Sequence, residues 1–157
     1  MIDHDAFRAV LGRFASGIVV ITTRDASGTP HGMTVSAFSS LSLHPPLVLV
    51  CIGNDATMAP VIANATTFAV NVLSDSQEAL SRRFAGKVDD RFSGVGYAVG
   101  ELGDAVLDDT LASLQCRIVA RHPAGDHMIV VGHVEQGAAR DGKPLLYYRG
   151  GYAQLER

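Results

Sequence analysis

The sequence has only two cysteines, no tryptophan and no apolar run near the roughly 20 residues of a membrane-spanning helix. Its net charge of −3 gives no electrostatic basis for binding nucleic acid. The N-terminal segment carries acidic residues early and lacks the apolar core of a signal peptide. We therefore expect a cytoplasmic protein in which Cys51 and Cys116 remain free thiols. At this length, residues 1–157 are expected to form one domain.

Motifs typical of several enzyme classes are also missing. Gly94-Val95-Gly96 followed by Gly100 does not match GxGxxG and lies in no βαβ unit, which argues against a Rossmann site. The sequence contains neither a GxxxxGK[ST] loop nor a GxSxG nucleophile motif. Its six histidines are scattered, without HExxH or paired cysteine spacing, so we expect no metal site.

Short segments of alternating or continuous apolar residues predict more strands than helices. Helices are predicted over residues 5–14, 57–62 (capped by Thr57) and 74–84 (with a Ser74–Gln77 capping box). Strands are predicted over residues 18–23, from 32 onward, and over 47–52, 67–73, 111–122, 128–134 and 145–148, with residues 87–103 as a long loop. Hairpin-length connections dominate, so the pattern predicts a mainly β fold with a few helices, an antiparallel barrel.

A run of hydroxyl residues is the most informative feature that is present. Its members are Thr34, Ser36, Ser39, Ser40 and Ser42, followed by Pro45-Pro46 and a wholly apolar strand. Hydroxyl groups are costly to bury without partners, and a phosphorylated ring cofactor would supply them. If residues 34–38 form one strand, Thr34 and Ser36 share a face and the small Ala37 lets a ligand approach the backbone. A solvated edge strand, or hydroxyl pairs within a sheet, is the alternative.

Cationic residues gather at the end of a predicted helix. Arg82, Arg83 and Lys87 carry groups that suit a phosphate. Cations at a helix C-terminus also complement the helix dipole, which is the alternative interpretation.

Two further segments carry candidate ligand-binding residues. Gly125-Asp126-His127 opens a strand, where the histidine can project into a cleft, although it could be structural and Asp126 could cap the turn. Residues 144–152 combine tyrosines with Arg149 and fit a flat ligand, a dimer contact or simply a last barrel strand.

Taken in order, these segments resemble the short-chain flavin reductases, the reductase components of two-component flavin-dependent monooxygenases. The likeness runs through residues 7–23, 32–52, 68–73, 83–85, 125–127 and 146–152. It implies an antiparallel Greek-key split β-barrel and a homodimer with two flavin sites near the subunit interface. It also implies FMN or FAD as flavin, NADH or NADPH as electron donor, and transfer of reduced flavin to a monooxygenase.

The resemblance also assigns site residues. The flavin ring and ribityl-phosphate chain are expected on Thr34, Ser36, Ala37, Ser39 and Ser40, continuing over Cys51, Ile52, Asn54 and Thr57, with Phe84, Ala85, Gly86 and Lys87 at the phosphate end and Tyr152 nearby. Gly125, Asp126 and His127 match the motif linked to the nicotinamide nucleotide, with His127 expected to position the nicotinamide. Which of Arg82, Arg83 and Lys87 meets the phosphate is left open.

Other functions are compatible with the same architecture. A pyridoxamine-phosphate-oxidase-like enzyme would bind FMN but act on a different substrate, and the Gly125-Asp126-His127 segment argues against it. A flavin- or haem-binding barrel without reductase activity is the second alternative.

Overall fold

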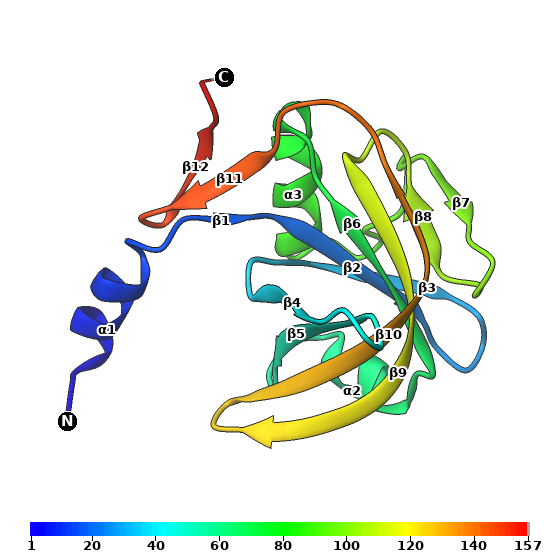
Figure 1. The fold of residues 1–157 in the computed structure, drawn as a ribbon, viewed down its shortest axis with the longest axis horizontal. Helices are drawn as coiled ribbons and strands as arrows, with labels where there is room; N and C mark the ends of the chain where they lie inside the picture. The colour runs from blue at the N-terminus through cyan, green and yellow to red at the C-terminus, as the bar shows by residue number, and fades with distance from the viewer. Residues whose placement is uncertain (157) are drawn as a thin grey trace.

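Seven antiparallel strands form the main sheet of the computed structural model, which describes residues 1–156 (Figure 1). Their order is β3-β2-β6-β9-β10-β5-β4, so β6 lies between β2 and β9 although β3, β4 and β5 separate β2 from β6 in the chain. The strands are β2 (Val19–Arg24), β3 (Pro30–Val35), β4 (Phe38–Ser42), β5 (Leu47–Gly53), β6 (Thr67–Val72), β9 (Ala112–Ala124) and β10 (His127–Ala139). This curled sheet confirms the predicted mainly β, antiparallel barrel class.

Smaller elements surround this sheet. Two short sheets accompany it: β1 (Ser16–Gly17), β11 (Leu145–Tyr148) and β12 (Gly151–Gln154) form one, and β7 (Tyr97–Val99) and β8 (Ala105–Leu107) the other. The helices are α1 (His4–Leu11), α2 (Ala59–Asn64) and α3 (Glu78–Ala85), with a 3-10 turn, η1 (Asp75–Gln77), before α3. No helix among residues 1–156 is long and apolar enough to cross a membrane.

The core consists of the inward-facing side chains of the main sheet, centred on Phe68. Side chains of β5 alternate, so Val48, Val50 and Ile52 are buried while the residues between them are half-buried. Gly132 of β10 allows the Phe68 ring to lie against the backbone, because a Cβ at that position would lie 2.6 Å from Phe68 Cζ. A second core cluster, which includes Val20 of β2 and Phe84 of α3, packs this helix against the sheet.

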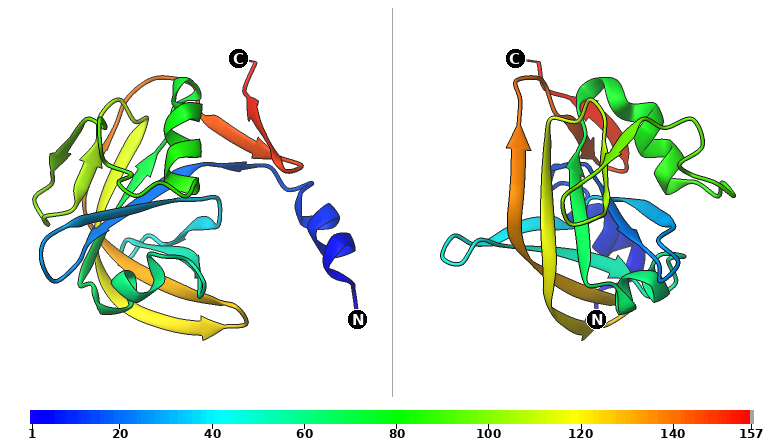
Figure 2. Two further views of the ribbon diagram at one scale, coloured as in Figure 1. Left: turned by 180° about the vertical axis from the view of Figure 1, so that it is seen from behind. Right: turned by 90° about the vertical axis from the view of Figure 1, so that its right-hand side faces the viewer.

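Helix α1 extends away from the barrel body (Figures 1 and 2). It buries none of its residues, and Phe7, Val10 and Leu11, with Phe14 just beyond it, are all exposed. The Arg149 N–H donates to Gly12 O at 2.9 Å and links the end of this segment to the C-terminal hairpin. An exposed apolar face of this kind is typical of a surface that packs against another chain.

Several predicted boundaries differ from the structure. Residues 87–103 are not one loop, because the exposed strand Tyr97–Val99 pairs with Ala105–Leu107 in a short hairpin. Thr57 does not cap a helix; α2 begins at Ala59 after Met58. The long hairpin turns only at Gly125 and Asp126, since β9 continues through Pro123. At Pro123 strand β9 has no partner on its other side, so the missing N–H costs no ladder bond.

Asp104 is buried without a partner. It is 1% exposed, and neither carboxyl oxygen has a hydrogen-bond partner among the described residues. Burial raises its pKa, and the nearby Thr67 hydroxyl and Arg24 guanidinium oppose that shift only in part.

Burial also raises the pKa of Cys116 to about 12. Both cysteines are free, as predicted, and a thiol so resistant to ionisation is a poor nucleophile.

Candidate functional site

The hydroxyl-rich segment is two strands rather than one. Strand β3 ends at Val35 and β4 begins at Phe38, and between them the Phe38 N–H donates to Ser36 O at 2.9 Å. The Cys51 N–H donates to Ala37 O at 3.0 Å, which attaches this connection to β5. The prediction that Thr34 and Ser36 share one face of a single strand is therefore wrong, because β3 ends at Val35 and the backbone changes direction at Ser36.

The hydroxyl groups of this segment differ in what they can still bind. Ser36, Ala37, Ser39 and Ser40 are exposed, whereas Thr34 is half-buried. The Thr34 hydroxyl donates to Ser81 O at 2.6 Å, so its oxygen can only accept a further bond. The Ser39 hydroxyl donates to Ser40 O at 2.8 Å. Among the exposed residues of this segment, Ser36 and Ser40 are the two whose hydroxyl groups make no hydrogen bond with the described residues, and Ala37 lies between them in the chain.

The end of β5 lies beside the start of β10, which brings two predicted segments together. Gly53 is paired with His127, and the Asn54 N–H donates to Asp126 O at 2.9 Å. His127 Nδ1 lies 2.7 Å from Asp126 Oδ1, and this bond holds the pKa of Asp126 below its usual value. A Cβ on Gly53 would lie 3.7 Å from His127 Nε2, so glycine keeps the space beside that nitrogen open. The Ile52 side chain points into the core, and only its backbone could meet a ligand.

Phe84 supports the site from beneath. Its ring is fully buried and packs edge-to-face on Phe92, with centroids 5.1 Å apart. A Cβ on Gly32 of β3 would lie 2.7 Å from Phe84 Cε1, so only glycine lets the strand approach this ring. Any contact of Phe84 with a ligand must therefore come from its backbone.

Two arginines hold the segment 86–96, which follows α3. Arg83 donates from Nε to Arg91 O at 2.6 Å and from Nη2 to Asp90 O and Ser93 O at 2.8 Å each. Arg91 donates to Gly32 O at 2.7 Å and to Gly86 O at 2.8 Å, which attaches the segment to β3. The role of Arg91 was missed in the sequence, where nothing marks an arginine whose partners are carbonyl groups.

The remaining candidate cations differ in their surroundings. The Arg82 guanidinium lies 4.7 Å from the centroid of the Tyr152 ring and 3.7 Å from Glu78 Oε1. The Tyr152 hydroxyl lies 2.8 Å from Ser81 Oγ, so this tyrosine is held against α3. Lys87 is exposed and makes no hydrogen bond or ion pair with residues 1–156. Of the three candidates, Lys87 is the one that has no ion pair or hydrogen bond within the described part of the chain.

A cleft of about 820 Å³, termed here the β3 cleft, opens beside this region. Thr57 and Lys87 line it, together with residues from the first half of β3 and from the segment 88–97. Thr57, expected along the flavin's ribityl-phosphate chain, and Lys87, expected at its phosphate end, thus face a common space. Residues 1–156 bring no three His, Cys, Asp or Glu side chains together as a metal site.

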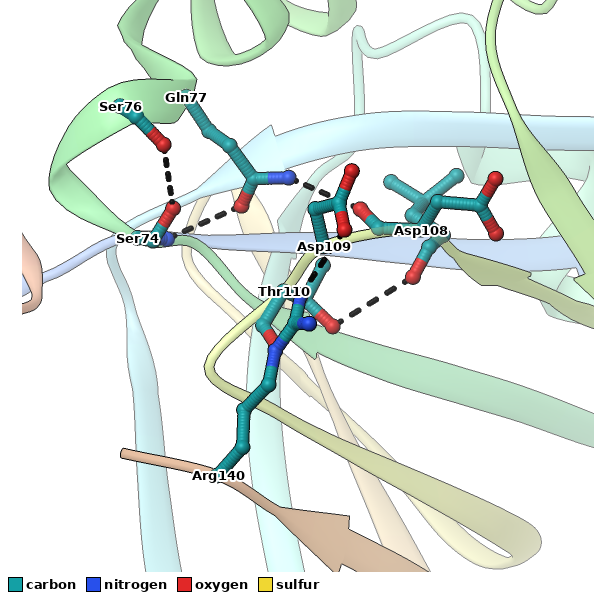
Figure 3. Close-up of polar contacts among 8 residues, drawn as sticks. Ser74, Ser76, Gln77, Asp108, Asp109, Thr110 and Arg140 are labelled. Atoms are coloured by element: carbon teal, nitrogen blue, oxygen red, sulfur yellow. Dashed lines mark hydrogen bonds and ion pairs between the residues drawn. The ribbon is translucent and has the colours of Figure 1, made fainter. Parts of the chain in front are cut away.

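The 3-10 turn η1 begins with the Ser74–Gln77 capping box and leads directly into α3, which carries several of these residues (Figure 3). The Ser74 N–H donates to Gln77 Oε1, and Gln77 Nε2 donates to Asp108 O, both at 3.0 Å. In the turn after β8, which contains Asp108, Arg140 Nε donates to Thr110 O at 2.7 Å. This network attaches α3 to the turn after β8, so the predicted capping box is confirmed.

Comparison with known proteins places these observations in a family context. The family model "Flavin reductase like domain" matches residues 11–156. A flavin reductase of Pseudomonas putida is 41% identical over 152 residues, covering 96% of this chain and 89% of that protein. The flavin-dependent monooxygenase reductase subunit HsaB of Mycobacterium tuberculosis is 40% identical over 158 residues, covering 99% and 84%.

A solved structure gives the same result at the level of the fold. The NADH:FAD oxidoreductase SgcE6 of Streptomyces globisporus C-1027, in complex with NAD and FAD fragments, matches with a TM-score of 0.92 at 35% identity. The match covers 98% of this chain and 93% of that one.

Proposed function

This chain belongs to the flavin reductase-like family, and from that premise we propose that it uses NADH to reduce a flavin, FMN or FAD, and supplies the product to a monooxygenase partner. When bound, the flavin would supply the chemistry as acceptor of a hydride from C4 of the nicotinamide. The protein must hold the two rings in contact and in the right orientation. The observation that carries the proposal is the meeting of Gly53–Asn54 with Asp126–His127 beside the exposed Ser36–Ala37 connection.

The residues around that connection fit a phosphorylated ring cofactor. Ser36 and Ala37 are accessible, and Asn54 and Thr57 follow at the exposed end of β5. Lys87 supplies the positive charge for the phosphate, since most of the Arg83 donors are used within the protein. Thr34 contributes as a hydrogen-bond acceptor. The other expected residues contribute through their backbone or by supporting the site, and these are Cys51, Ile52, Phe84, Ala85 and Gly86.

His127 positions the donor rather than exchanging protons with it. Its Nδ1 is paired with Asp126, which leaves Nε2 facing the space that Gly53 keeps open. Hydride transfer requires no general base, so a fixed hydrogen-bonding ring is sufficient for this role.

A homodimer is the second part of the proposal. The exposed apolar residues of α1 need a covering surface, and a second copy of the chain would supply one. Flavin sites near such an interface would be partly enclosed by the partner subunit, which would exclude water from the reacting rings.

The direct test is an assay of NADH consumption with the purified protein. We expect oxidation of NADH that requires added FMN or FAD and that is accompanied by reduction of the flavin. A protein that binds flavin and does not oxidise NADH would contradict the proposed reaction. Oxidation of NADH independent of added flavin in a colourless protein would contradict it equally.

His127→Ala is expected to raise the KM for NADH about tenfold while the Kd for flavin changes less than threefold. A tenfold change corresponds to about 1.4 kcal/mol, which is near the upper end of the roughly 0.5–1.5 kcal/mol that one hydrogen bond typically contributes. His122→Ala, which removes an exposed histidine of β9, is the matched control and should leave both constants unchanged. An unchanged KM together with lost flavin binding would show that His127 serves the flavin instead.

A further inference from the structure

The β3 cleft continues beyond the residues assigned to the flavin phosphate. Thr57 and Lys87 line it, yet none of its lining residues belongs to the Ser36–Ala37 connection or to Gly125–His127. His31, at the start of β3, lies in the cleft, and Thr34, near the end of the same strand, lies close to that connection. At about 3.3 Å per residue, these two positions are about 10 Å apart along the strand. The cleft therefore extends from the phosphate end away from the reacting rings.

FMN ends at its phosphate, so it would leave this space empty. FAD continues there with a second phosphate, a ribose and an adenine. A volume of about 820 Å³ lies toward the upper end of small-molecule sites, which span about 300–1,000 Å³. We propose that the β3 cleft binds the adenosine-phosphate half of FAD, and that the chain therefore prefers FAD to FMN. The inference rests on the proposed function, because it takes the flavin phosphate to lie at Thr57 and Lys87.

The aromatic part of the cleft suits a purine base. Tyr97 lines the cleft and is 39% exposed, and its ring packs edge-to-face on Phe92, with centroids 5.3 Å apart. Phe92 in turn packs on the buried Phe84, so the tyrosine rests on a series of rings that ends in the core. An accessible ring held in this way offers a surface on which adenine can stack.

The polar part of the cleft suits a ribose and phosphates confined to one end. His31 Nε2 lies 2.9 Å from Asp25 Oδ2, and Asp25 Oδ1 accepts the Ser27 and Thr29 N–H groups at 2.9 and 3.0 Å. The imidazole is thereby fixed in the cleft, and Nδ1 has no partner among the described residues. Lys87 gives the cleft a positive charge for the phosphates, and Asp89 and Asp90, which also line it, offer carboxylate acceptors for ribose hydroxyl groups.

NADH also carries an adenosine, and two features favour FAD as the occupant. The cleft is continuous with the proposed flavin phosphate site, and it contains no residue of Gly125–His127, where the nicotinamide nucleotide is placed. A nicotinamide at His127 would have to extend past the flavin to reach Tyr97.

The test compares the dissociation constants of FAD and FMN, measured by flavin fluorescence, in the full-length protein and in Tyr97→Ala. In the unmodified protein we expect FAD to bind at least tenfold more tightly than FMN. In Tyr97→Ala the Kd for FAD should rise about tenfold and that for FMN should stay within twofold, which also verifies folding. Tyr97→Phe should retain FAD affinity because the ring is kept. Val99→Ala, on the same exposed strand but outside the cleft, is the matched control.

Each alternative gives a different result. Equal affinity for the two flavins in the unmodified protein, or a parallel loss of both in Tyr97→Ala, would overturn the inference while leaving reductase activity intact. In Tyr97→Ala, a raised KM for NADH with an unchanged Kd for FAD would also overturn the inference, because the cleft would then bind the adenosine of NADH. Failure of the proposed function is distinct, since neither flavin would then support oxidation of NADH.

Discussion

Arg83→Ala is expected to release the segment 86–96 from the barrel and to weaken flavin binding by more than tenfold. The substitution removes three hydrogen bonds to the carbonyl groups of Asp90, Arg91 and Ser93. Bonds from a charged donor contribute about 1.5–3 kcal/mol each and are not additive, so we expect a total loss of about 3 kcal/mol in the free energy of unfolding. Flavin affinity falls as well, because Lys87 lies in the released segment. Denaturant titration measures the loss of stability, proteolysis measures the release of the segment, and flavin fluorescence measures the loss of affinity.

Two variants distinguish the geometry of Arg83 from its charge. Arg83→Lys keeps the positive charge but cannot reproduce the planar fork, so it should lose most of the stabilisation. Arg82→Ala removes the neighbouring guanidinium, which lies on the outer side of α3, and should leave proteolysis within the segment unchanged. Equal proteolysis of the Arg82 and Arg83 variants would contradict the proposed anchoring.

Gly132→Val is expected to lower the free energy of unfolding by about 3 kcal/mol or to prevent folding. A Cβ at this position would lie 2.6 Å from Phe68 Cζ and 2.8 Å from Cys116 Cβ, and valine adds two methyl groups to that overlap. Phe68 is fully buried at the centre of the main core and cannot move without displacing several neighbours. Thermal and denaturant unfolding measure the loss, and expression as insoluble protein is the extreme outcome.

Gly137→Val in the same strand is the matched control for this effect. A Cβ there would lie 3.1 Å from a methyl group of Leu114, at the end of a flexible side chain, and the position is exposed. We expect a change within about 1 kcal/mol. If both valine variants lose the same stability, β-branching in the strand rather than overlap with Phe68 is responsible.

Local signals in the sequence were sufficient for much of the fold. The capping residues Ser74 and Gln77 correctly placed the start of the helical segment, because that signal depends on four consecutive residues. The β2–β3 hairpin and the apolar β5 were equally visible, since alternation or continuous apolar character follows from burial. Local signals failed for β7 and β8, which are three residues each and are stabilised by pairing with each other rather than by their own pattern.

The candidate site was predicted less well than the fold, for a physical reason. The order of its segments was recognisable through the family resemblance, but the state of each side chain depends on partners distant in sequence. Thr34 donates to a carbonyl group 47 residues later, and Arg91 to one 59 residues earlier. Phe84 lies beneath the site because Gly32 lets β3 approach it, a relation that neither residue reveals alone. The break at Ser36 arises where the chain passes from β3 to β4, and alternation of hydroxyl groups concealed it.

The pairing of β1 with β11 has a consequence for how the protein is made. Ser16 lies opposite Tyr147, so a ribosome completes almost the whole chain before the first strand can meet its partner. Until β11 has been made, β1 has no strand partner, so its backbone N–H and C=O groups depend on water for their hydrogen bonds. The β1–β11 pairing is therefore a late event during synthesis, and it joins two segments that are far apart in the sequence.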